Sequence, residues 1–89
     1  MTRMLVKNVV EDFDRWRRVF DAQREPARVA GLETLHIWRD ADRPHIAYVL
    51  FSVADRRRAD AFVHDPASAK VGEDAGVLGG ELTYLEHVD

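Results

Sequence analysis

The stretch Ala47-Tyr-Val-Leu-Phe-Ser-Val53 decides the fold, because it is apolar at almost every position. A strand with one exposed face alternates apolar and polar residues, whereas a nearly continuous apolar run is typical of a strand that is covered on both faces. The chain has only 89 residues and too few helical segments to cover a sheet twice. We therefore expect helices on one face of the sheet and a second copy of the chain on the other.

Runs of apolar and β-branched residues between turn signals predict four strands. These strands cover Arg3–Val10, Leu32–Arg39, His45–Val53 and Glu81–His87. The polar turn Asp40–Pro44 joins the second strand to the third, which predicts an antiparallel hairpin. We interpret Gly79-Gly80 as a loose turn before the last strand.

The first helical segment begins after Asp12, a residue type that caps helices well. Pro26 is expected to kink or end this helix, because proline lacks the backbone donor and clashes with the preceding turn. A further turn or two follows over Ala27–Ala30, and Gly31 ends the segment in the left-handed conformation. The buried stripe of this helix is predicted from residues at helical spacing, namely Phe13, Trp16, Val19, Phe20 and Gln23.

The second helical segment begins after Asp55, and its inward residues are expected to be Ala59, Phe62 and Val63. Asp65-Pro66 starts a short further helix that runs to about Ala75, where Gly76 stops it.

The order strand, helix, strand, strand, helix, strand predicts the split βαβ, ferredoxin-like arrangement of the α+β class. Both helical segments then lie on the same face of a four-stranded antiparallel sheet, in a single domain over residues 1–89. The other face is a bare apolar patch, larger than monomers usually tolerate. A two-fold homodimer with stacked sheets is the commonest way to cover it.

Composition limits the partners that we expect. The net charge of −3 does not favour binding to nucleic acid or to an anionic membrane surface. No apolar run approaches the roughly 18 residues of a membrane span, and the first residues do not resemble a signal peptide. The chain has no cysteine, so it has neither disulfides nor a thiolate nucleophile, which fits a cytoplasmic protein.

Five groups of residues make nearly the whole chain resemble the dimeric α/β-barrel superfamily, and within it the small antibiotic-biosynthesis monooxygenase and polyketide cyclase-like proteins. These groups are Val10–Trp16 with Val19–Asp21, Trp38–Asp40 before Pro44-His45, Ala59–Phe62, Asp65-Pro66, and Ala75–Gly79. The resemblance implies a pocket inside each subunit, between the sheet and the helices. It also implies an aromatic or polyketide-like substrate that supplies its own electrons to oxygen, or that cyclises through an enol. The superfamily hosts several activities, so the fold does not fix the reaction.

Four residues are candidates for the chemistry. Asn8 lies in the first strand, where an amide must be hydrogen-bonded or face a wet pocket; a cross-strand hydrogen bond is the alternative. His36 could act as an acid or base near neutral pH, or could lie hydrogen-bonded at the sheet edge. Tyr48 shares a face of its strand with Ile46 and Leu50, and its hydroxyl could meet a substrate or simply complete the packing.

His64, the fourth candidate, ends the second helix, where it could serve as a cap or as an acid–base group. Haem-degrading relatives place an iron-binding histidine on this helix, so the resemblance makes His64 the candidate axial ligand. The tryptophan that those relatives carry near the end of the third strand is replaced here by Phe51–Val53. Trp16, Trp38 and Phe62 are expected to be apolar walls of the substrate pocket, with core or interface roles as the alternative for the tryptophans.

No sequence motif indicates a metal site or a cofactor-binding site. The histidines lack metal-ligand spacing, and the chain has no glycine-rich phosphate loop and no nucleophile elbow. We therefore expect no metal and no nucleotide cofactor. Three functions stay open: a cofactor-independent oxygenase or cyclase, a ligand-binding or stress-linked dimer without turnover, and haem degradation.

Overall fold

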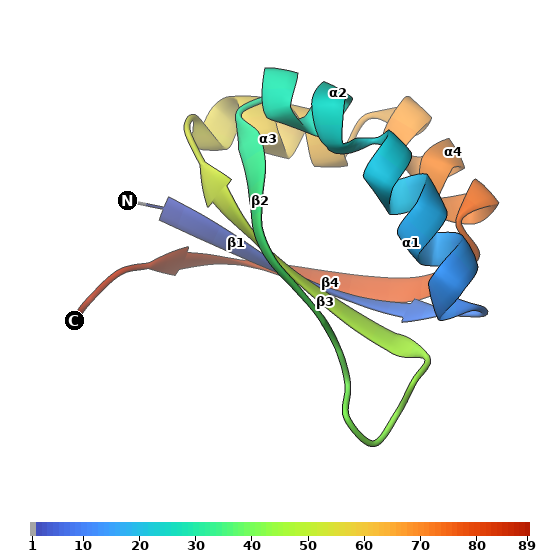
Figure 1. Cartoon of the computed structure of the whole chain (residues 1–89). Coiled ribbons are helices and arrows are strands. Elements are labelled where there is room, and N and C mark those ends of the chain that lie inside the picture. The colour runs from blue at the N-terminus through green and yellow to red at the C-terminus, as the bar shows by residue number, and fades with distance from the viewer. Residues whose placement is uncertain (1) are drawn as a thin grey trace.

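The computed structural model describes residues 2–89, which form a four-stranded antiparallel sheet and four helices. In chain order the elements are β1 (Thr2–Val10), α1 (Phe13–Ala22), α2 (Arg24–Val29), β2 (Leu32–Arg39), β3 (Ile46–Val53), α3 (Arg56–Val63), α4 (Pro66–Asp74) and β4 (Val77–Glu86). The strand order is β2-β3-β1-β4, as the ferredoxin-like arrangement requires. All four helices lie on one face of the sheet (Figure 1), which confirms the predicted fold class.

The helices begin where the sequence predicts, at aspartates whose carboxylates accept backbone N–H groups. Asp12 accepts from the amides of Asp14 and Arg15 at 3.0 and 3.4 Å. Asp55 and Asp65 cap α3 and α4 in the same way. Each cap satisfies donors that the first helical turn leaves unpaired, which fixes where the helix enters the fold.

The first helical segment is two helices rather than one kinked helix. α1 ends at Ala22, and α2 begins at Arg24, so the break precedes Pro26 by several residues. The reason is the missing N–H of Pro26, which would have donated to the carbonyl of Ala22 in a continuous helix. Gly31 then ends α2 with a φ of 87°, the left-handed conformation that was predicted for it.

The interpretation of Gly79-Gly80 as a turn is wrong, because both residues lie inside β4. Gly79 pairs with Val9 and Gly80 pairs with Asn8 of β1. A Cβ on Gly80 would lie 2.6 Å from Oδ1 of Asn8, so the glycine makes room for the amide of its neighbour. β4 therefore spans Val77–Glu86 rather than beginning at Glu81.

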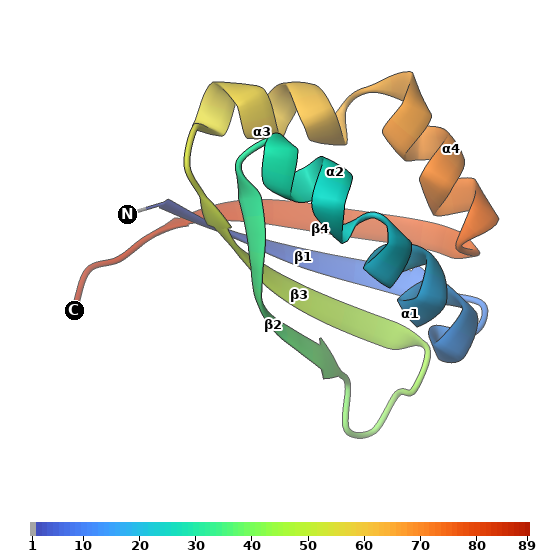
Figure 2. The ribbon, with the colours of Figure 1, turned by 45° about the horizontal axis from the view of Figure 1, so that its top comes forward.

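The four helices cover one face of the sheet (Figure 2). The core lies between these two layers and consists of two clusters. One cluster consists of Met4, Ala27, Leu32, Val53 and Ala59, and the other of Val10, Trp16, Ala47, Val49 and Ala75. Val6 and Phe51 pack against both clusters and connect them. The helix-facing side of β3 thus consists of every second residue of the apolar run quoted above, namely Ala47, Val49, Phe51 and Val53.

The opposite side of β3 carries Ile46, Tyr48, Leu50 and Ser52, and no helix of residues 2–89 covers it (Figure 1). We call this side of the sheet the open face. Leu5 of β1 pairs with Leu50, and Trp38 of β2 pairs with Tyr48, so apolar side chains extend across three strands. The expectation that both faces of β3 are apolar is therefore correct, and nothing in residues 2–89 covers one of them. None of the helices in the described part of the chain has the length and apolar character needed to cross a membrane.

Candidate functional site

A cavity of about 410 Å³ lies between the helices and the helix-facing side of the sheet. Its walls come from all four helices and from β2 and β3. The lining consists of Val19, Phe20, Gln23, Arg24, Pro26, Ala27, Thr34, Phe51, Phe62, Asp65, Ala67, Ser68, Val71, Gly72 and Ala75. Several of the residues on α2 and α4 are exposed, so the cavity opens to solvent between these helices.

Three phenylalanines from different elements form the apolar walls of this cavity. The ring centroids of Phe20 on α1 and Phe51 on β3 are 6.0 Å apart, and Phe62 contributes from α3. Trp16 lies behind Phe20, with ring centroids 5.2 Å apart, and is only 3% exposed. Trp16 therefore supports the wall from the core and does not line the cavity itself.

Some polar side chains of the lining are hydrogen-bonded within the protein, and others are not. Ser68 Oγ donates to the carbonyl of Phe62 at 2.6 Å, and the Asp65 carboxylate accepts from the amide of Ala67 at 2.8 Å. Both groups complete the junction between α3 and α4. Gln23 and Thr34 have no side-chain hydrogen bond within residues 2–89, so their polar atoms are available to a ligand.

The structure brings only part of the sequence-derived site together. Phe62 lines the cavity. Asn8 lies on the helix-facing side of β1, where it pairs with Ala47 and Gly80, but it is not part of the lining.

His36, Tyr48 and Trp38 lie on the open face instead. The rings of His36 and Trp38 are stacked, with centroids 5.2 Å apart and an interplanar angle of 27°. A bulge between Thr34 and His36 shifts the pairing by one residue, so His36 pairs with Leu50. These three residues therefore share a face with one another and are separated from the cavity by the sheet.

His64 is the C-cap residue of α3, and its side chain is exposed. Its Nδ1 lies 2.9 Å from the carbonyl oxygen of Asp60, a hydrogen bond in which the ring donates. This contact supports the capping interpretation, since the residue satisfies a carbonyl in the last turn of its own helix.

Three lining residues with polar atoms available to a ligand were not selected as site residues from the sequence, although the sequence carried a weak signal for two of them. Gln23 belongs to the predicted stripe of α1, and Thr34 alternates with Leu32 onto the helix-facing side. Nothing in the sequence marked Arg24 as a site residue, because it follows Gln23, the last residue of the predicted buried stripe, and resembles any exposed arginine. Its place in the cavity depends on the break between α1 and α2.

The side chains with shifted pKa values lie outside this cavity. Burial, and then the hydrogen bond to Asp60, raises the pKa of Tyr84 from 10.0 to about 12. Backbone amides of Asp42 and Arg43 lower the pKa of Asp40 at the hairpin turn. No group of three or more histidine, aspartate or glutamate side chains within residues 2–89 is placed to hold a metal ion.

Comparison with known proteins confirms the fold. No model of a protein family matches the chain, and no curated protein matches its sequence. Among solved structures, an antibiotic biosynthesis monooxygenase superposes with a TM-score of 0.72 at 14% identity, over 100% of both chains. A proposed antibiotic biosynthesis monooxygenase from Bordetella bronchiseptica superposes with a TM-score of 0.78 at 8% identity, over 98% of this chain and 96% of its own.

A proposed antibiotic biosynthesis monooxygenase from Caulobacter crescentus gives a TM-score of 0.74 at 14% identity, over 99% of this chain and 90% of its own. The predicted resemblance is thus confirmed at the level of the fold. At these identities the likeness concerns the course of the backbone and does not carry an activity.

Proposed function

We propose that the chain is a homodimeric enzyme similar in type to antibiotic-biosynthesis monooxygenases and cyclases, acting on an aromatic or polyketide-like molecule without a metal or nucleotide cofactor. The observation that supports this function is the cavity of about 410 Å³ with walls of Phe20, Phe51 and Phe62. Its volume falls within the range of small-molecule sites, and aromatic walls with a few polar groups at the edge are typical of them.

The chemistry would depend on the substrate's own reactivity. In an oxygenation, a CH₂ group beside an activated ring loses two hydrogens and becomes a carbonyl; one atom of O₂ enters the product and the other leaves as water. In a cyclisation, an enol carbon of the substrate attacks a carbonyl carbon of the same molecule; the enol becomes a ketone, the attacked carbonyl becomes a hydroxyl, and the enol proton is transferred to that oxygen. In both reactions the protein excludes water and donates hydrogen bonds to a developing oxyanion, and Gln23, Arg24 and Thr34 are the donors at the cavity edge.

Blocking the cavity tests this proposal. Ala67 is exposed and lines the cavity on α4, so Ala67→Trp places an indole at the mouth without disturbing the core. Ala69→Trp adds the same side chain to an exposed position of α4 that does not line the cavity. We expect the neutral probe N-phenyl-1-naphthylamine to bind the unmodified chain with enhanced fluorescence.

Ala67→Trp should weaken that binding about tenfold or more, and Ala69→Trp should leave it unchanged. Consumption of O₂, or ring closure, with a panel of phenols and 1,3-diketones then tests turnover. Absence of binding to the unmodified chain, or equal binding to both variants, would remove the cavity from the function.

The dimer is the second part of the proposal, and the open face supports it. Trp38 is 48% exposed there, and Tyr48, Leu50 and Leu5 lie beside it with no covering element in residues 2–89. Leu50→Glu places a charge at the centre of this face, whereas Ala61→Glu places the same charge on an exposed position of α3. In sedimentation at micromolar concentration, the unmodified chain and Ala61→Glu should behave as dimers and Leu50→Glu as a monomer. A monomeric unmodified chain refutes this part.

A binding protein without turnover is the alternative function, and one observation favours it. The two histidines expected to supply acid–base chemistry, His36 and His64, do not line the cavity. If either one acts as acid or base, its replacement by alanine lowers turnover about 10²–10⁴-fold. Probe binding without O₂ consumption or ring closure would establish the alternative.

The geometry does not favour haem degradation. His64, the candidate axial ligand, lies at the exposed end of α3 and does not line the cavity, although the bond from Nδ1 to its own helix leaves Nε2 free within residues 2–89. Titration with haemin gives a direct test, because an axial histidine shifts the haem absorbance.

A further inference from the structure

A second, smaller cavity of about 190 Å³ lies beside the first. It is lined by Arg24, Arg28, Leu32, Glu33 and Thr34. Arg24 and Thr34 line both cavities, so they stand at the boundary between them. A large apolar space is thus next to a small space to which four polar residues contribute.

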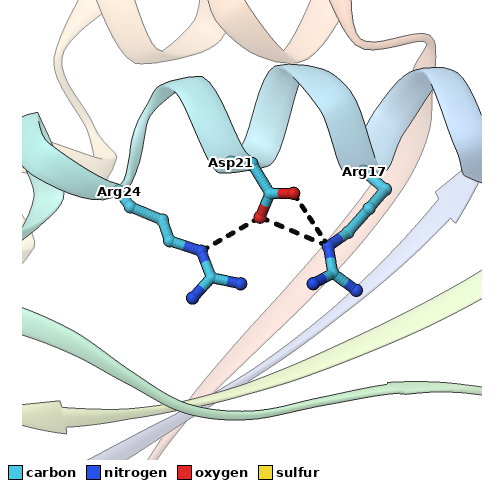
Figure 3. A network of polar contacts seen from close by, with 3 residues as sticks. All are labelled: Arg17, Asp21 and Arg24. Atoms are coloured by element: carbon cyan, nitrogen blue, oxygen red, sulfur yellow. Dashed lines mark hydrogen bonds and ion pairs between the residues drawn. The ribbon is translucent and has the colours of Figure 1, made fainter.

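Arg24 belongs to a network that carries a net positive charge. Nε of Arg24 donates to the Asp21 carboxylate at 3.0 Å, and Nε of Arg17 donates to the same carboxylate at 3.2 Å. Figure 3 shows Asp21 between the two arginines. One carboxylate therefore serves two guanidinium groups, which leaves one positive charge without a counter-charge within the network.

Arg28, the other cation of the small cavity, is already neutralised. Its Nη2 and Nε donate to the two carboxylate oxygens of Glu25 at 2.6 and 2.9 Å. Glu33, which also lines the small cavity, adds a further negative charge near Arg28. Arg28 therefore has two carboxylates near it, whereas Arg17 and Arg24 share one, and of this pair only Arg24 lines the cavities.

The free end of Arg24 lies at the apolar wall. Its guanidinium carbon is 5.5 Å from the ring centroid of Phe20, which lines the larger cavity. Apart from Nε, the nitrogens of this guanidinium have no partner within the part of the chain that the structure describes. The half-buried Thr34 hydroxyl, also without a partner there, offers a second donor at the same boundary.

We propose that the site takes an amphipathic organic acid, with its aromatic or polyketide-like body in the larger cavity and its carboxylate or enolate on Arg24 and Thr34. This inference rests on the proposed function and specifies its substrate class. A guanidinium with free N–H groups binds a carboxylate through charge-assisted hydrogen bonds, and the partly apolar surroundings strengthen them. A neutral molecule with the same body fills the larger cavity but offers no acceptor to the remaining N–H groups of Arg24.

Two fluorescent probes with the same aromatic body test the inference. 8-Anilinonaphthalene-1-sulfonate carries an anionic group, whereas N-phenyl-1-naphthylamine lacks it. Arg24→Gln should weaken binding of the anionic probe about tenfold or more and leave the neutral probe unchanged. Arg17→Gln is the matched control, because it removes the same charge and the same contact with Asp21 but lies outside both cavities.

The outcomes separate this inference from the proposed function. Ala67→Trp should weaken both probes, which assigns them to the cavity. If the neutral probe binds the unmodified chain in the cavity but Arg24→Gln leaves the anionic probe unaffected, the inference is wrong and the proposed function stands. An equal loss in Arg17→Gln also refutes it, since the effect would then be general surface charge. If neither probe binds the unmodified chain, the proposed function itself fails.

Discussion

The hydroxyl of Tyr84 joins β4 to α3 through a hydrogen bond. We predict that removing this hydroxyl lowers the stability of the fold in a pH-dependent way. The hydroxyl donates to Oδ1 of Asp60 at 2.6 Å. The guanidinium carbon of Arg56 lies 4.1 Å from the centroid of the Tyr84 ring. Tyr84→Phe deletes the hydroxyl and keeps the ring, so the contact with Arg56 and the packing against the core remain.

A hydrogen bond to an ionised carboxylate contributes about 1.5–3 kcal/mol when it is shielded. Asp60 is exposed, and solvent screening reduces this value to about 1 kcal/mol. In a domain of this size, a loss of about 1 kcal/mol lowers the melting temperature by roughly 4–8 °C. We expect that decrease for Tyr84→Phe near neutral pH.

The effect should disappear at high pH. Folding raises the pKa of Tyr84 from 10.0 to about 12, so the folded state retains the proton more strongly than the unfolded state. The stabilisation is therefore complete below pH 10.0 and is lost as the pH rises toward about 12. Over this interval the free energy of unfolding should fall more for the unmodified chain than for Tyr84→Phe, so that the two values converge.

Urea unfolding followed by circular dichroism, at one fixed protein concentration, measures both quantities. The concentration is held constant because association would add to the apparent stability. Asp60→Ala supplies the control: in that background Tyr84→Phe should cost little, since the acceptor is already gone. Equal stability of the unmodified chain and Tyr84→Phe at neutral pH, or parallel pH dependence above pH 10.0, would show that the hydroxyl is not bonded as described.

Two further predictions concern turns. Gly31→Ala should lower the free energy of unfolding by about 1–2 kcal/mol, because φ is 87° and the new Cβ meets Cβ of Ala54 at 3.3 Å; Gly79→Ala, where nothing lies within 4 Å, should be neutral or stabilising in the same urea titration. Folding lowers the pKa of Asp40 below 3.8, mainly through the amides of Asp42 and Arg43, so its stabilisation is present above pH 3.8 and is lost on acidification. Asp40→Ala should therefore flatten the acid limb of the stability curve, whereas an unchanged limb would refute a structural role for this turn.

The features that the sequence predicted well are determined locally. β2 has the predicted bounds, and the aspartate caps act within the first turn of their own helices. Gly31 and Gly76 adopt positive φ at the ends of helices, where only the backbone of the same segment decides the conformation. No distant contact is needed for any of these features.

β4 shows where local propensity fails. Two consecutive glycines disfavour a strand, because they lose much conformational entropy and have no side chains to pack. The long ladder with β1 outweighs that preference, and the close approach of Asn8 to Gly80 makes glycine the residue that fits. The two glycines pair with Val9 and Asn8, at least seventy residues earlier in the chain, so the extent of this strand was not available from the local pattern.

The site residues selected from the sequence do not lie together, and the reason is related. Alternation along β3 correctly placed Tyr48 with Leu50, but alternation along β2 is interrupted by the bulge at Leu35. A regular ladder continuing from the pair Thr34 and Phe51 would place His36 opposite Val49, on the helix-facing side. One extra residue moves the histidine to the open face, because a shift of one position reverses the direction of a side chain. When both faces of a strand are apolar, no hydrophobic penalty marks such a shift in the sequence. Among the side chains of the sheet, register alone then decides which ones reach the cavity, and in this chain it leaves Thr34 at the cavity while His36 and Tyr48 lie on the open face.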